Sequence, residues 1–118
     1  MVNIIDTVCA KADEASIRQA GQILKRGGLV AFPTETVYGL GADALNGDAA
    51  AKIYAAKGRP SDNPLIVHIT ERKMLDAIVS EVSTQAELLM EKFWPGPMTL
   101  IFKKSALVPY GTTGGLDT

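Results

Sequence analysis

The sequence predicts an α/β layer fold. Three short apolar runs, at residues 29–32, 64–69 and 98–103, are each bounded by glycine, proline or polar residues and predict strands. The segments between them carry apolar residues at helical spacing. Strands that alternate with helices in this way are typical of α/β layers. The length of 118 residues and the 47% share of hydrophobic residues fit one globular domain.

The first helix is predicted over residues 13–26. Its inward face is indicated by small and apolar residues at the i, i+3, i+4, i+7 spacing: Ile17, Ala20, Gly21 and Leu24. Gly27-Gly28 ends this helix. The strand at residues 29–32 is continuously apolar, as in strands buried on both faces. Residues 1–8 predict an edge strand from their β-branched side chains.

Three further helices are predicted, over residues 49–57, 71–80 and 84–93. Asp48 is expected to cap the first of them, and Thr84 with Glu87 matches a capping box for the last. The residues from Ser105 onward are expected to form a loop with no closing element. Because such a chain would leave a sheet edge exposed, we expect it to be the N-terminal portion of a longer domain.

Composition narrows the possible functions. Cys9 is the only cysteine and His68 the only histidine, which excludes an internal disulfide and argues against a Cys/His metal site. No stretch approaches the roughly 20 apolar residues of a membrane span. The N-terminus lacks a signal-peptide pattern, so we expect a cytoplasmic protein. The net charge of -1 gives no general reason to expect nucleic-acid binding.

A hydroxyl-rich segment follows the first predicted strand, and it has two interpretations. In the first, the hydroxyls of Thr34 and Thr36 bond the local backbone of a turn. In the second, they form the rim of a pocket for a small polar ligand, with Tyr38 as a flat wall. Gly39 and Gly41 would then permit close approach of the backbone.

A cationic segment follows the second predicted helix. Lys57 and Arg59 are explained either by the helix dipole, which favours basic residues at a C-terminus, or by a phosphate site. A guanidinium can grip a phosphate with two hydrogen bonds, while a lysine acts as a point charge. Asn63 follows in a proline-stiffened loop and could bind a phosphate, a ribose or a base edge. A Walker loop and a Gly-x-Gly-x-x-Gly fingerprint are both absent from the sequence.

His68 lies in the apolar run 64–69. A lone histidine there is more often a core residue than a catalyst. If it faces the pocket, it can bond a carboxylate or hydroxyl of a substrate. Trp94 is interpreted as a packing anchor, and Cys9 as a small apolar residue. We expect the hydroxyl-rich and cationic segments to face one hollow.

Taken together, these segments resemble the YrdC/TsaC-type threonylcarbamoyl-AMP synthase family. The matching segments are GG at 27–28, PTETVYGLG at 33–41, KGRP at 57–60, NPLIVH at 63–68, WPGPMT at 94–99 and GLDT at 115–118. The resemblance covers the chain from about Gly21 onward. It implies a twisted mixed sheet with flanking helices and a large positive cavity.

The resemblance also implies a reaction. The family converts L-threonine, bicarbonate or carbon dioxide, and ATP to threonylcarbamoyl-AMP and pyrophosphate. The product feeds the threonylcarbamoyladenosine modification of tRNA, which partner proteins complete. Mg²⁺ is expected to accompany ATP, and no protein metal ligand is implied.

Residue roles follow by similarity. Thr36 and His68 would hold L-threonine, with Thr34 and Tyr38 lining the same end. Lys57 and Arg59 would be the catalytic cations and would bind ATP together with Asn63 and Thr118. Family members continue past Thr118 into a strand with a threonine-binding arginine and a later Ser-x-Asn segment, so we expect this chain alone to be inactive or impaired.

Three alternatives remain open at the level of sequence. One is a carbamoyl-adenylate-forming domain like that of hydrogenase-maturation proteins, which uses carbamoyl phosphate. The second is a module that binds tRNA or double-stranded RNA, for which Lys52, Lys57 and Arg59 offer a local basic patch. The third is a scaffold without catalytic activity.

Overall fold

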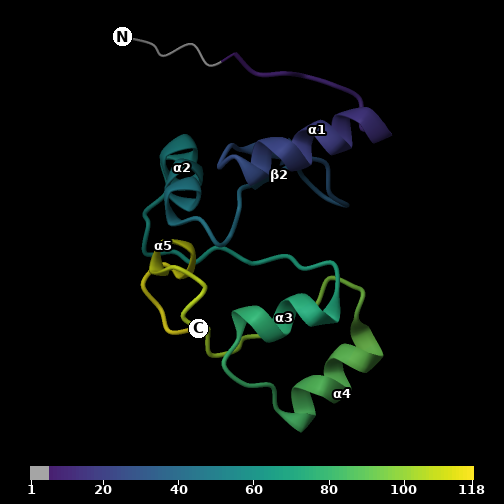
Figure 1. Cartoon of the computed structure of the whole chain (residues 1–118), viewed down its shortest axis with the longest axis vertical. Coiled ribbons are helices and arrows are strands. Elements are labelled where there is room, and N and C mark those ends of the chain that lie inside the picture. Colours follow the sequence, from purple (N-terminus) through teal and green to yellow (C-terminus); the bar gives the residue numbers. More distant parts are fainter. Residues whose placement is uncertain (1–5) are drawn as a thin grey trace.

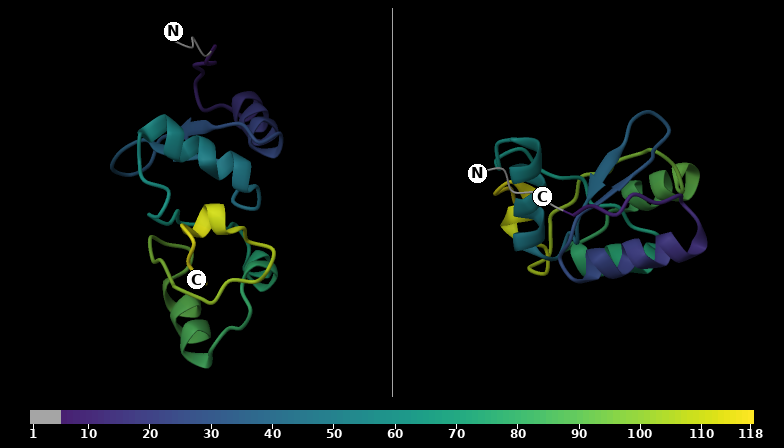
Figure 2. Two further views of the ribbon diagram at one scale, coloured as in Figure 1. Left: turned by 90° about the vertical axis from the view of Figure 1, so that its left-hand side faces the viewer. Right: turned by 90° about the horizontal axis from the view of Figure 1, so that it is seen from above.

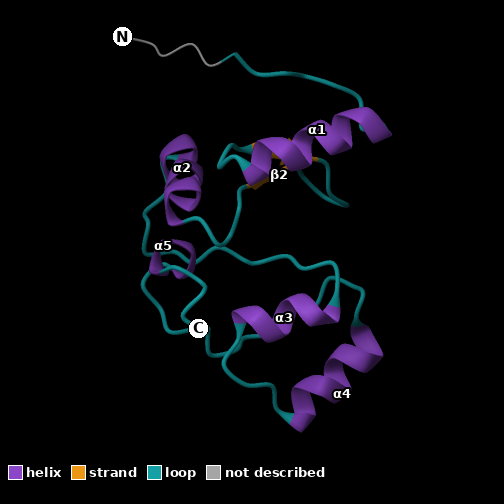
Figure 3. Ribbon diagram, in the orientation of Figure 1, coloured by secondary structure: helices purple, strands orange, loops and turns teal. Residues whose placement is uncertain are grey.

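The computed structural model describes residues 6–118. Its elements are α1 (Glu14–Lys25), β1 (Val30–Phe32), β2 (Gly39–Gly41), α2 (Gly47–Lys57), α3 (Arg72–Ile78), α4 (Thr84–Phe93) and α5 (Tyr110–Thr113). Figure 1 shows α1, the strands and α2 at one end of the molecule, α3 and α4 at the other, and α5 between the two groups. The α/β class with flanking helices is confirmed, but the sheet among the described residues has only two strands (Figure 3).

Helix α1 begins where the sequence predicts. Asp13 is its N-cap, and its carboxylate accepts a 2.9 Å hydrogen bond from the backbone N–H of Ser16. The Ser16 hydroxyl also bonds this carboxylate and lowers the pKa of Asp13. The predicted inward face is wrong, since no residue of α1 is buried and Ile17 is 61% exposed. Among the described elements, the main contact of α1 is with β1.

The two strands form an antiparallel hairpin, with Val30 opposite Gly41 and Phe32 opposite Gly39. Strand β1 occupies the predicted position but is an exposed edge rather than a strand buried on both faces. The ring of Phe32 lies across the glycines of β2, because a Cβ atom at Gly39 or Gly41 would come within 2.9 Å of it. The close approach that these two glycines permit is therefore to the ring of Phe32, a residue of the same chain. Strand β2 was not predicted, since its GLG sequence carries little strand propensity.

Helix α2 begins earlier than expected. Its N-cap is Asn46, whose side-chain oxygen accepts 3.1 Å hydrogen bonds from the N–H groups of Asp48 and Ala49. The prediction of Asp48 as the cap is wrong, because Asp48 already lies in the first turn. Gly58 ends the helix in the left-handed conformation, with φ of 59°. The buried side of α2 consists of Ala49, Ala50, Ile53 and Tyr54.

Replacing Asn46 with alanine is expected to lower the free energy of unfolding by about 1 kcal/mol, because two backbone donors at the start of α2 lose their acceptor. Urea unfolding monitored by circular dichroism measures this effect. Asn46→Asp is the control, since it keeps an acceptor oxygen and should retain most of the stability. Equal losses in both variants would contradict the capping role.

The structure confirms the predicted positions of α3 and α4, although α3 is shorter than expected. The N-cap of α4 is Ser83, whose hydroxyl accepts a 3.2 Å hydrogen bond from Ala86, so the predicted Thr84 capping box is wrong. Glu87 pairs instead with Arg72 of α3, which also pairs with Asp76. Hydrogen bonds from Arg72 to these carboxylates raise its pKa above the ordinary arginine value. The guanidinium thus links α3 to α4.

The predictions of strands at residues 64–69 and 98–103 are wrong. Both segments alternate between half-buried and exposed residues, as strands do, but neither has a strand partner in the part of the chain that the structure describes. Within residues 6–118, no backbone-to-backbone hydrogen bond involves residues 66–69 or 98–102. A strand requires a ladder of such bonds, so the apolar alternation alone did not produce one. The nearest approach to a ladder is a single bridge between Val79 and Lys104.

The described part of the chain leaves much apolar surface open. Its radius of gyration is 15.5 Å, whereas a compact domain of this length has about 13–14 Å. Its accessible surface is 9046 Å², against roughly 6200 Å² for a compact protein of this mass. Ile66 and Ile101, on the two unpaired segments, are 64% and 81% exposed.

None of the described helices is long and apolar enough to span a bilayer.

Candidate functional site

The loop after α2 is fixed at several points. The backbone N–H of Arg59 donates to the carbonyl of Tyr54 at 3.0 Å, and the Tyr54 hydroxyl donates to the carbonyl of Asn63 at 2.8 Å. Farther along, the N–H of Leu65 donates to the carbonyl of Thr112 at 3.0 Å. Residues 59–65 are therefore held between α2 and α5.

Helix α5 was predicted as loop, and it joins segments that are distant in sequence. Thr112 is only 1% exposed, and its hydroxyl donates to the carbonyl of Ala44 at 2.7 Å. Gly114 follows the helix with φ of 64°, and a Cβ atom there would lie 2.9 Å from the backbone of Asp62. The sequence contains no clear signal for this element, because four residues are too few to show helical periodicity.

The segment that follows α5 is also held in place. The Tyr110 hydroxyl donates to a carboxylate oxygen of Asp117 at 2.9 Å, and this bond raises the pKa of Tyr110. The ammonium of Lys104 lies 4.2 Å from the centre of the Tyr110 ring. The backbone of Lys104 donates to the carbonyl of Asp117 at 2.9 Å. These contacts fix the residue that precedes Thr118.

Arg59 differs from the other cations in its surroundings. Its side chain is half-buried, and its Nε atom is buried without a hydrogen-bond partner among the described residues. Lys57 is exposed at the last turn of α2. Lys52 does not contribute to a free basic patch, because its ammonium donates to the carbonyl of Gly27 at 2.6 Å. The cationic site is therefore centred on Arg59 and Lys57.

The hydroxyl-rich segment forms the six-residue tip of the β1–β2 hairpin, which projects from the molecule in Figure 2. The Thr34 hydroxyl donates to the carbonyl of Val37 and accepts from the N–H groups of Thr36 and Val37, at 3.3 and 3.2 Å. The local-turn interpretation thus holds for Thr34. Thr36 and Tyr38 are exposed, with Tyr38 at 76%.

A large open groove of about 1440 Å³ lies between the two unpaired segments. It is lined by residues 64–72 and 94–102, by parts of α3 and α4, and by Glu35, Lys104 and Thr118 among others. Of the predicted site residues, His68 and Thr118 lie in this lining. Glu35, which the predicted site did not include, brings the hairpin tip to the same groove.

The other predicted residues lie outside the lining of this groove: Thr34, Thr36, Tyr38, Lys57, Arg59 and Asn63. The hydroxyl-rich segment contributes Glu35 to the lining, and the loop after α2 contributes Pro64 and Leu65. Its acidic lining residues, Glu35, Glu71, Glu87 and Glu91, outnumber Arg72 and Lys104, so the expected positive cavity is not this groove. The groove lacks the expected positive charge because the predicted cations, Lys57 and Arg59, lie at the C-terminal end of α2 and just beyond it.

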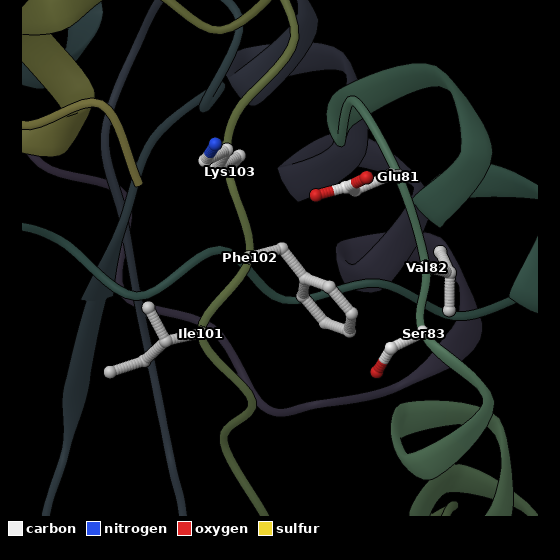
Figure 4. Close-up of a pocket in the computed structure, with 6 residues that line it drawn as sticks. All are labelled: Glu81, Val82, Ser83, Ile101, Phe102 and Lys103. Carbon is white, nitrogen blue, oxygen red and sulfur yellow. The ribbon is translucent and has the colours of Figure 1, made fainter.

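A second hollow of about 280 Å³ lies beside the start of α4. Figure 4 shows the Phe102 ring directed toward Val82 and Ser83, with Lys103 and Glu81 above it at the left and right of the view. None of the predicted site residues lines it, and we assign it no chemistry. Within residues 6–118, no group of three or more His, Cys, Asp or Glu residues is arranged to hold a metal ion.

The sequence and the fold of this chain are similar to those of known proteins. Residues 22–118 match the Sua5/YciO/YrdC family model, described as "Telomere recombination". This chain belongs to the Sua5/YciO/YrdC family. It is 51% identical over 117 residues to the threonylcarbamoyl-AMP synthase of Pyrococcus abyssi, and 53% identical over 108 residues to that of Bacillus subtilis.

These relatives are much longer than the chain. The alignments cover 99% and 90% of the chain but only 34% and 31% of the P. abyssi and B. subtilis proteins. The structure of P. abyssi Sua5 complexed with L-threonine superposes with a TM-score of 0.85 at 52% identity, over 92% of this chain and 32% of that one. The chain thus spans about a third of these Sua5/YciO/YrdC family members.

Proposed function

We propose that this chain forms the substrate-binding part of an L-threonylcarbamoyladenylate synthase that acts in tRNA modification. Its substrates would be L-threonine, ATP, and carbon dioxide or bicarbonate. The proposal is supported by the relatives that carry the name threonylcarbamoyl-AMP synthase and by the P. abyssi structure with L-threonine. The whole protein is proposed to be a cytoplasmic nucleotidyltransferase, with partner proteins that transfer its product to tRNA.

The observation that carries the proposal is the Arg59 guanidinium, whose buried Nε donor has no hydrogen-bond partner among residues 6–118. A buried N–H group without an acceptor costs about 1–3 kcal/mol, so proteins rarely retain one without a reason. A phosphate oxygen would accept hydrogen bonds from the guanidinium and pair with its positive charge. Lys57, two residues earlier, adds a second charge. The backbone of Asn63 is held by the Tyr54 hydroxyl, and its side-chain amide offers donors to the ribose or phosphates.

The reaction needs these cations for a physical reason. The threonine nitrogen forms a bond to the carbon of CO₂ and loses a proton, which gives a carbamate. A carbamate oxygen then attacks the α-phosphorus of ATP, and the bond to the β-phosphate breaks to release pyrophosphate. Both reacting groups are negative, so fixed positive charge lowers the barrier. Mg²⁺ would arrive with the ATP phosphates, as is usual for nucleotide substrates.

Pyrophosphate release tests the proposal. The chain is incubated with L-threonine, bicarbonate, Mg²⁺ and ATP, and each substrate is omitted in turn. Pyrophosphate should form only when all are present, at a rate reduced by the open groove. A C-terminally extended chain should be faster. Pyrophosphate that depends on carbamoyl phosphate instead of threonine and bicarbonate would favour the hydrogenase-maturation type of activity.

Replacing His68 with alanine is expected to weaken L-threonine binding about tenfold while leaving ATP affinity unchanged. His68 is exposed and lines the large groove, which Glu35 of the hairpin tip also lines. The imidazole of His68 is therefore available to a carboxylate or hydroxyl of a ligand. Calorimetric titration with each substrate measures the two affinities. Equal weakening of both would indicate a packing role for His68.

A further inference from the structure

Tyr54 lies where the candidate nucleotide residues are held together. It is on the buried side of α2 and is 5% exposed. Its backbone carbonyl accepts from Arg59, and its side-chain hydroxyl donates to the carbonyl of Asn63. One residue therefore binds both ends of the segment that carries the Arg59 guanidinium and the Asn63 amide.

The hydroxyl of Tyr54 has a role that packing alone does not need. The buried ring would fill the same space as a phenylalanine, and the other buried residues of α2 are alanine and isoleucine. A buried phenol needs a polar partner, and this one finds it in the loop at 2.8 Å. Residue 63 itself is exposed, so the bond fixes a segment that faces solvent.

We propose that Tyr54 is a positioning residue for the nucleotide, because it sets the spacing between the Arg59 guanidinium and the Asn63 amide. This inference rests on the proposed function. Without the phenol, Asn63 would sample more positions, and a nucleotide would have to order it on binding. Threonine contacts other residues in the proposed site, so its affinity should not depend on Tyr54.

Tyr54→Phe in the full 118-residue chain is the test, with ATP and L-threonine affinities measured by calorimetry. ATP should bind about threefold to tenfold more weakly, as expected for one lost hydrogen bond, and threonine equally well. In an Asn63→Ala background, Tyr54→Phe should add no further loss, since the side-chain amide that Tyr54 positions is absent there. Losses that multiply in the double variant would indicate a general structural effect and overturn the inference.

Ser105→Ala is the matched control. It also removes a hydroxyl-to-carbonyl hydrogen bond, the 2.7 Å contact with Ala77, but outside residues 59–63. It should leave ATP affinity unchanged, and circular dichroism should show all variants folded. Unchanged ATP affinity in Tyr54→Phe overturns the positioning role alone. A wild-type chain that binds threonine but no ATP contradicts the proposed function, and the positioning role fails with it.

Discussion

Replacing Arg59 with alanine is expected to weaken ATP binding about 10- to 100-fold, the effect of losing one or two charge-assisted hydrogen bonds. The stability of the chain should not fall with it. The Nε donor of Arg59 is buried without a partner among residues 6–118, so its removal relieves an unfavourable burial. Calorimetry with ATP and urea unfolding measure the two quantities separately.

Two further variants make the Arg59 result specific. Arg59→Lys keeps the charge but loses the planar fork, and it should recover only part of the affinity. Arg18→Ala removes an exposed arginine that pairs with Glu14 on α1, and it should leave ATP binding unchanged. If Arg59→Ala lowered stability and left ATP affinity intact, Arg59 would be a packing residue and the proposed phosphate site would be wrong.

Replacing Gly114 with alanine is expected to lower the free energy of unfolding by about 2–5 kcal/mol, through backbone strain and a steric clash. Its φ of 64° is unfavourable for any residue with a Cβ atom. That atom would also lie 2.9 Å from the backbone of Asp62 and 3.1 Å from the nitrogen of Pro64. The clash is with backbone in a proline-stiffened loop, which cannot yield as a side chain can.

Gly58 provides the matched control for Gly114. It has a similar φ of 59° at the end of α2, but a Cβ atom there would meet nothing within 4 Å. Gly58→Ala should therefore show the strain alone, about 1–2 kcal/mol. The difference between the two variants in urea unfolding isolates the contact between the residues after α5 and the loop 59–65. Equal losses would show that this loop adjusts without resistance.

Local signals explain which parts of the fold were predictable. The range 13–26 and the glycine break at Gly27-Gly28 bound α1 correctly, because caps and glycine breaks act within a few residues of the chain. The start of a helix differed from the prediction where two nearby residues could each act as the N-cap. Asn46 takes the cap predicted for Asp48, and Ser83 takes that predicted for Thr84.

The candidate site likewise contains residues that the sequence predicted and residues that it did not. The sequence singled out Arg59 from its charge and Asn63 from its place in a proline-stiffened loop, and the structure holds both in the segment after α2. It could not identify Tyr54, Thr112 or Gly114, whose importance comes from contacts across the chain. The Thr34 hydroxyl bonds the local backbone, as the local-turn interpretation expects, and its role toward L-threonine stays a prediction.

By itself, the sequence determined the α/β class, the positions of the main helices and the segments that identify the family. These depend on short-range periodicity, caps and motif order, all of which are present in the linear chain. Only the tertiary structure decided which apolar runs are strands. Residues 64–69 and 98–103 have the strand pattern but no ladder among the described residues, because pairing depends on what lies beside a segment in space.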